Sequence, residues 1–170
     1  MKVNLSLVAV AASLSLISCQ KDAVVSEESI PVVQSSRNNY QNDVPFKGDY
    51  ITTAQFIQGP AVQIIRGVGE ASHLGESSFV ANATVNLTTP PPFAIAGTAV
   101  FTAANGDQFF TQFTGTNTPL GNGIARGILN HVITGGTGRF EDATGAFTGI
   151  ATVNQANPTN TVSFDGWIQY

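Results

Sequence analysis

The stretch that decides the fold is GGTGRFEDATGAFTGIATV, residues 135–153. Its first part, residues 135–145, consists mostly of glycine, threonine and charged residues, which are typical of a turn. The part that follows, residues 146–153, mixes apolar residues with threonine and suits a β-strand. A second strand-like segment, residues 124–134, lies just before the turn. The stretch therefore predicts two antiparallel strands joined by an elaborate turn.

Apolar and polar residues alternate with a period of two on both sides of this hairpin, and turn residues interrupt the alternation about every ten positions. Helical spacing is absent from this part of the chain. Asn105-Gly106-Asp107 predicts a tight hairpin turn, and the prolines of residues 90–92 end a strand because three prolines cannot sit in a central strand. The predicted strands are residues 49–58, 62–73, 77–88, 93–103, 108–115, 124–134, 146–153 and 161–169.

Eight antiparallel strands in one domain, residues 46–170, predict an all-β protein with a single closed barrel. Closure is favoured because it removes the unpaired edges of a sheet. A barrel of eight strands is either filled by side chains or holds one small ligand. The aromatic side chains that would line such a pocket or plug such a core are Phe101, Phe109, Phe110, Phe113, Phe147, Phe164 and Trp167.

The turn stretch resembles the Gly-Thr-Gly-Arg/Lys-Phe turn of the allene oxide cyclase and dirigent barrels, and that of their bacterial relatives. GEASHLGESSF, residues 69–79, resembles a second segment of those relatives, where one long strand ends and the next begins. The resemblance implies an eight-stranded barrel with a hydrophobic cavity. No residue here matches the acidic cavity residues of the plant enzymes, so catalysis is not carried over. We expect the turn to be architectural, with Phe140 plugging one barrel end and Arg139 pairing with Glu141 or Asp142.

The N-terminus carries a second signal, the run that ends in LSLISCQKD at residues 14–22. Residues 3–17 are almost continuously apolar or small, which suits the h-region of a signal peptide and is too short for a membrane-spanning helix. The residues up to Cys19 resemble the lipobox of bacterial lipoproteins. The resemblance implies that residues 1–18 are removed and that Cys19 is acylated. The alternative is an ordinary cleaved signal, in which Cys19 is lost or structural.

Residues 19–45 predict a lipidated cysteine followed by a flexible tether. The segment is rich in polar residues and has no sustained periodicity, so it cannot bury enough apolar surface to fold. Gln20-Lys21-Asp22 and the acids that follow resemble a surface-export signal of some Gram-negative lipoproteins. This implies a lipid anchor in the outer membrane with the domain exposed at the cell surface. The alternative is an outer-membrane lipoprotein that faces the periplasm.

Candidate ligand-binding residues lie on two predicted strands. Arg66 and Glu70 share one face of residues 62–73, and Arg126 and Asn130 share one face of residues 124–134. If these faces point inward, the four side chains form a polar cluster in an apolar cavity and favour a carboxylate ligand. If they point outward, the charges face solvent or pair with each other. Both faces of both strands are partly apolar, so alternation alone does not choose between the two.

Composition excludes several classes of function. The formal net charge of −4 argues against nucleic-acid binding, which needs basic patches. The two histidines, His73 and His131, show no metal-site spacing, and no nucleotide loop or catalytic elbow is present, so we expect no metal and no cofactor. A barrel that binds a small hydrophobic ligand is favoured. A structural or interaction lipoprotein with a filled barrel is the main alternative, and an isomerase or cyclase is a third class.

Overall fold

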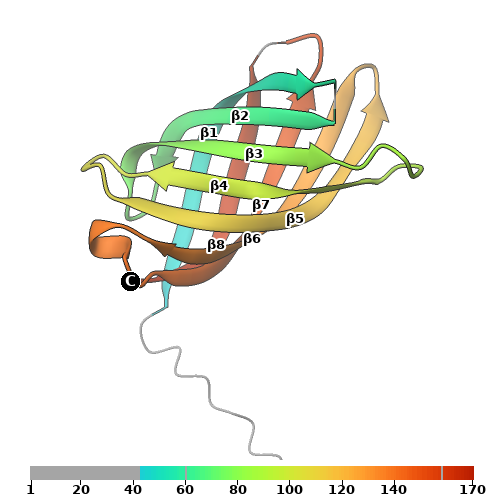
Figure 1. Ribbon diagram of the computed structural model, residues 1–170. Helices are drawn as coiled ribbons and strands as arrows, with labels where there is room; N and C mark the ends of the chain where they lie inside the picture. Colours follow the sequence, from blue (N-terminus) through green and yellow to red (C-terminus); the bar gives the residue numbers. More distant parts are fainter. Residues whose placement is uncertain (1–42, 60, 158) are drawn as a thin grey trace, which may run out of the picture. The chain divides into compact units, whose positions relative to one another are not determined.

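The computed structural model describes residues 43–59, 61–157 and 159–170, which form a closed antiparallel barrel (Figure 1). Every strand pairs with its neighbours in sequence, and the first pairs with the last. The all-β, eight-stranded barrel predicted from the sequence is therefore confirmed. Its elements are β1 Val44–Gln58, β2 Val62–Ala71, β3 Gly75–Val85, β4 Phe93–Thr102, β5 Gln108–Gly121, β6 Ile124–Gly136, the 3₁₀ turn η1 Gly138–Phe140, β7 Thr144–Asn154 and β8 Asn160–Gln169.

Five strands are longer than the sequence predicts, and β1 and β5 differ the most. β1 begins at Val44 because Val44 and Pro45 pair with Ile168 and Trp167 of β8, so these two residues belong to the barrel. β5 continues to Gly121 through a segment that reads as a loop, and only Asn122 and Gly123 connect it to β6. The predicted signal peptide of residues 1–18, Cys19 and the predicted tether up to residue 42 lie outside the described residues.

The barrel has two different ends. The connections β2–β3, β4–β5 and β6–β7, with the start of β1 and the end of β8, lie at one end, which we call the closed end. The connections β1–β2, β3–β4, β5–β6 and β7–β8 lie at the other end, the open end. In Figure 1 the turn η1 and the C-terminus mark the closed end.

Phenylalanine rings fill the closed half of the barrel. Phe101 stacks on Phe109 with ring centroids 4.7 Å apart, and Phe46 meets both rings edge to face. Phe140 of η1 is fully buried and packs edge to face on Phe109 and Tyr170. The expected plug by Phe140 is confirmed. Because aromatic side chains bury a large apolar area, this cluster closes the end and stabilises the fold.

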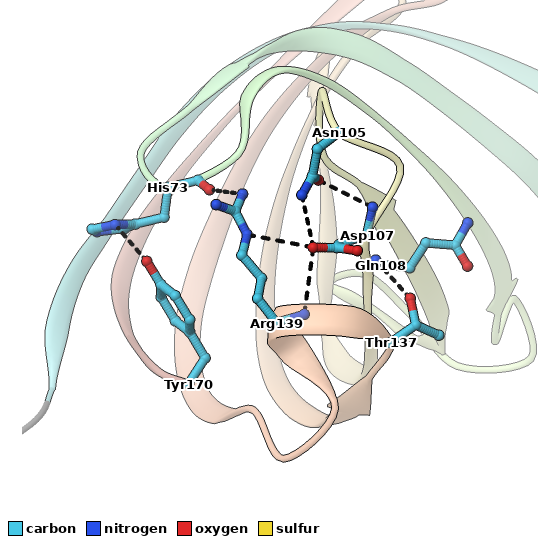
Figure 2. A network of polar contacts seen from close by, with 7 residues as sticks. All are labelled: His73, Asn105, Asp107, Gln108, Thr137, Arg139 and Tyr170. Carbon is cyan, nitrogen blue, oxygen red and sulfur yellow. Dashed lines mark hydrogen bonds and ion pairs between the residues drawn. The ribbon is translucent and has the colours of Figure 1, made fainter.

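A polar network on the outside of the plug ties three turns together (Figure 2). Arg139 donates a hydrogen bond to the backbone carbonyl of His73, and its Nε lies 3.9 Å from Oδ2 of Asp107. Asp107 in turn accepts from the amide of Asn105 at 2.7 Å. The pairing of Arg139 with Glu141 or Asp142 expected from the sequence is therefore replaced by one with Asp107, which the β4–β5 turn brings beside η1. The turn stretch therefore holds the closed end together through its contacts with the β2–β3 and β4–β5 turns.

Candidate functional site

A cavity of about 560 Å³ occupies the open half of the barrel. Side chains from every strand line it, and small residues take many of the inward positions, among them Ala54, Ala81, Ala125 and Ala151. Many inward positions in the closed half carry phenylalanine instead, among them Phe46, Phe101, Phe109 and Phe147. The change from phenylalanine to alanine along the barrel axis leaves one half hollow and the other filled. A volume of this size lies within the range of small-molecule sites, about 300–1,000 Å³.

The inner end of the cavity is aromatic. Phe79, Phe113 and Phe164 line it together with His131. Two inward glycines make room for these rings, since a Cβ at Gly67 would lie 2.2 Å from Phe79 and a Cβ at Gly149 would lie 2.6 Å from Phe164. The floor therefore offers flat apolar surfaces to a ligand.

His131 is the polar group of this floor. It is 3% exposed and is stacked on Phe147 at 4.7 Å, with Phe113 4.8 Å away. Its Nδ1 shares a hydrogen bond of 3.0 Å with the hydroxyl of Thr111, which is also buried. Its Nε2 is the buried side-chain atom that has no hydrogen-bond partner in the described part of the chain. A buried polar atom without a partner is costly, which marks Nε2 as a place where a ligand group would be stabilised.

Burial decides the charge of His131. Desolvation lowers the pKa of this imidazole to about 3, so the ring is neutral at physiological pH. A neutral imidazole has one N–H and one bare nitrogen. With Nδ1 held by Thr111, Nε2 presents a single neutral donor or acceptor. A hydroxyl, carbonyl or ether group of a ligand matches it, whereas a charged group would lose its hydration without gaining an opposite charge.

Amide side chains surround the mouth of the cavity. Three of them are oriented by the chain: Asn154 Oδ1 accepts from the N–H of Ala156, Asn157 Oδ1 from Thr159, and Asn160 Oδ1 from Asn154. Since these backbone donors fix which side-chain atom is oxygen, each asparagine has its NH₂ group left over for other partners. The mouth is therefore polar but uncharged on its β7–β8 side.

The four candidates taken from the sequence lie elsewhere. Arg66, Glu70, Arg126 and Asn130 are exposed on the outer wall, and none lines the cavity. Arg66 contacts Gln55 at 3.5 Å, and Asn130 accepts from Thr148 at 3.2 Å. Of the two orientations that the sequence left open, the outward one is correct and the inward cluster does not form, because β2 and β6 turn their other faces to the lumen. A carboxylate ligand is therefore no longer indicated, because none of the arginines that the structure describes faces the cavity.

The candidate site residue that the sequence reading missed is His131. It stands on the face of residues 124–134 opposite to Arg126, with Leu129 and Ile133, and the sequence shows it only as a histidine among apolar residues. One physical signal points to the correct face. An unpaired buried charge is much more costly than an exposed isoleucine, so the arginine face of each strand belongs outside.

The cavity contains little acid–base chemistry. His131 is its one ionisable lining residue among those that the structure describes. Tyr50, whose pKa is raised by burial and whose hydroxyl bonds Ser77 at 2.7 Å, does not line it. Residues 43–59, 61–157 and 159–170 contain no group of three potential metal ligands. In the same residues, no helix is long and apolar enough to cross a membrane.

Comparison with known proteins gives no match, whether to a family model, to a curated protein or to a solved structure. The function must therefore be argued from the cavity itself.

Proposed function

We propose that this protein is a lipid-anchored barrel that binds one small, largely apolar, uncharged molecule in the open half of its lumen. The observation that carries the proposal is the cavity of about 560 Å³ with the unpartnered Nε2 of His131 at its inner end. Apolar pockets with a few convergent polar groups are typical of small-molecule sites. The aromatic floor would hold the apolar part of the ligand, and His131 would accept or donate one hydrogen bond.

The filled-barrel alternative accounts for the closed half only. There the phenylalanines leave no such space, whereas the open half combines small inward side chains with an accessible mouth. An isomerase or cyclase would need an acid and a base placed together, and His131 has no second ionisable group beside it among the described cavity residues. Binding is therefore the function that we propose, rather than catalysis.

The lipid anchor is proposed from the sequence, through acylation of Cys19 after removal of residues 1–18. Two or more acyl chains hold a protein stably at a membrane, whereas a single chain does not. The location that we propose is the outer membrane, with the barrel at the cell surface or, alternatively, in the periplasm.

Titration with the neutral apolar fluorophore N-phenyl-1-naphthylamine tests the binding proposal. The full chain is produced with Cys19→Ser so that no acyl group interferes. Ala151 lines the cavity and its neighbour Thr152 faces outward, so Ala151→Phe and Thr152→Phe form a matched pair. We expect saturable binding of one fluorophore that is at least tenfold weaker in Ala151→Phe and unchanged in Thr152→Phe. Equal binding by both variants, or no saturation, would establish the filled-barrel alternative.

The role of His131 is tested by displacing the same fluorophore with two ligands of equal chain length. 1-Decanol carries a hydroxyl group and 1-chlorodecane does not. A net hydrogen bond contributes about 0.5–1.5 kcal/mol, which corresponds to a two- to twelvefold change in affinity. We expect His131→Phe to weaken the binding of 1-decanol by that factor and to leave the binding of 1-chlorodecane unchanged. Equal losses for the two ligands would mean that His131 contributes shape alone.

A further inference from the structure

The open end carries large apolar side chains that face solvent. Phe56 and Ile57 lie at the end of β1, Leu87 follows β3, and Leu120 and Ile124 flank the β5–β6 turn. These residues come from three of the four connections at this end. Monomeric proteins rarely expose a group of such residues at one place without a binding role.

Two of these side chains are placed by β-bulges. Ile57 has no pairing partner between Phe56 and Gln58 in the β1–β2 ladder, and Leu120 has none between Pro119 and Gly121 in the β5–β6 ladder. The bulged residues are 54% and 61% exposed. Bulges occur at barrel rims and re-aim a side chain away from the regular alternation. The backbone therefore departs from its regular pairing at two separate places and each time presents a large aliphatic side chain to solvent.

The apolar end is continuous with the cavity and carries no negative charge. Phe56 and Leu87 are exposed and also line the cavity. The chain has no aspartate or glutamate in residues 56–63, 86–93, 118–125 or 154–160, which form this end. Arg126, exposed just after the β5–β6 turn, is the nearest charge on β6. Such a surface can approach anionic headgroups without repulsion, and an arginine near them adds attraction.

We propose that the open end of the barrel docks onto the surface of a lipid bilayer that contains anionic headgroups. Ile57 and Leu120 enter the boundary between headgroups and acyl chains, as the apolar residues of interfacial proteins do. The mouth of the cavity then opens onto the bilayer. This inference goes beyond ligand binding and is tested separately from it, since neither Ile57 nor Leu120 lines the cavity.

Site-specific labels test the docking directly. Leu120→Cys at the open end and Glu141→Cys at the closed end are made in the full chain with Cys19→Ser and labelled with the fluorophore NBD. Ile57→Cys is a second label site should Leu120→Cys fail to fold. On vesicles of phosphatidylcholine and phosphatidylglycerol in equal parts, we expect the open-end label to shift to the blue and to be quenched by doxyl-labelled lipids. The closed-end label should keep its emission in water.

Matched variants then identify the side chains responsible. Ile57→Ser with Leu120→Ser is compared with Ile51→Ser with Val68→Ser, a pair on the outer wall that is 57% and 64% exposed. All variants keep the N-terminal segment, so its own affinity for lipid is the same throughout. We expect at least tenfold weaker vesicle binding for the open-end pair and less than a twofold change for the wall pair.

Three results would overturn the docking proposal. One is an NBD label at the open end that stays in water on vesicles. Another is equal vesicle binding by the two double variants. The third is a natural chain that self-associates without lipid and becomes monomeric only in the open-end double variant, because the surface would then bind a second copy. Loss of vesicle binding together with retained N-phenyl-1-naphthylamine binding, in the open-end double variant, would support docking independently of the ligand site.

Discussion

His131 makes the stability of the barrel depend on pH. Its pKa is lowered to about 3 by burial, from the ordinary value of 6.5 that it regains on unfolding. The unfolded chain therefore binds a proton between these values while the folded chain does not, and the free energy of unfolding falls as the pH drops below 6.5. Each pH unit in this window costs about 1.4 kcal/mol. We expect a loss of about 2 kcal/mol between pH 7 and pH 5, measured by urea unfolding.

The control for this prediction removes both partners of the buried hydrogen bond. His131→Phe with Thr111→Val keeps the shapes and leaves no unpaired polar group, which by itself costs little. This double variant should lack the histidine part of the slope between pH 7 and pH 5. If the natural chain and the variant lose stability in parallel, His131 is not held neutral in the folded state.

At the residue scale, the sequence reading located the candidate strands but not the inward face. Ile128 and Val132 lie on the outer face beside Arg126, so hydrophobicity marks both sides of β6. Alternation fixes the period of a strand, whereas the choice of face depends on how the closed barrel distributes volume and charge. The contacts of His131 with Thr111 and Phe147 come from other strands, so the sequence alone did not show that this histidine is buried.

At the element scale, the turn around η1 depends on a glycine with left-handed backbone. Gly138 has φ +57°, and a Cβ there would lie 2.1 Å from Asp107 Oδ1. Gly106 in the β4–β5 turn has φ +92° and nothing within 4 Å of such a Cβ. We expect Gly106→Ala to cost about 1–3 kcal/mol through backbone strain alone. Gly138→Ala should cost up to about 1 kcal/mol more, because Asp107 must move away from Arg139 and this partly exposed ion pair is lost.

Urea unfolding of the two glycine variants separates strain from the contact with Asp107. Equal losses would mean that the network of Arg139 and Asp107 adapts freely and does not hold the closed end. Asp107→Asn serves as a further control, since it keeps the size of the side chain and removes the charge that Arg139 approaches.

The turns were the most predictable elements. Gly and Asn at the hairpin tips and the prolines of residues 90–92 separated all the strands because their backbone angles exclude continued pairing. The largest error occurred in β5, where Pro119 and Gly121 suggested a loop. There the ladder to β6 accommodates them by a bulge at Leu120, which preserves pairing on both sides. Whether a strand continues past a proline therefore depends on its pairing with the neighbouring strand, not on its own sequence.

At the scale of the whole molecule, the half-filled lumen could not be derived from composition. The same phenylalanines could line a pocket or plug a core, and only the registers of the closed barrel gather Phe46, Phe101, Phe109 and Phe140 at one end. The alanines at the other end then leave the cavity. The two ends thus differ in structure: one is filled by aromatic side chains, and the other is open with an apolar rim.

The position of Val44 sets a constraint on the protein with the lipid anchor that we propose. β1 begins at the closed end, so the chain that leads to Cys19 leaves the barrel opposite to the mouth. An extended chain spans about 3.4 Å per residue, which gives residues 20–43 a reach of about 80 Å. The barrel itself is about 25–30 Å tall. The natural spacer is therefore long enough for the mouth to reach the bilayer that would hold the proposed anchor.

Shortening the spacer should abolish that arrangement. Deletion of residues 26–40 leaves a reach of about 30 Å. The spacer must run along the outside of the barrel from the closed end to the open end, and this path is longer than the reach that remains. In the acylated chain that begins at Cys19, bound to vesicles, we expect an NBD label at Leu120→Cys to lie in the bilayer with the natural spacer and in water after the deletion. Replacing residues 26–40 by a glycine–serine segment of equal length should restore insertion, because reach rather than sequence is required. A label that stays inserted after the deletion would mean that neighbouring molecules or vesicles present the bilayer to the mouth.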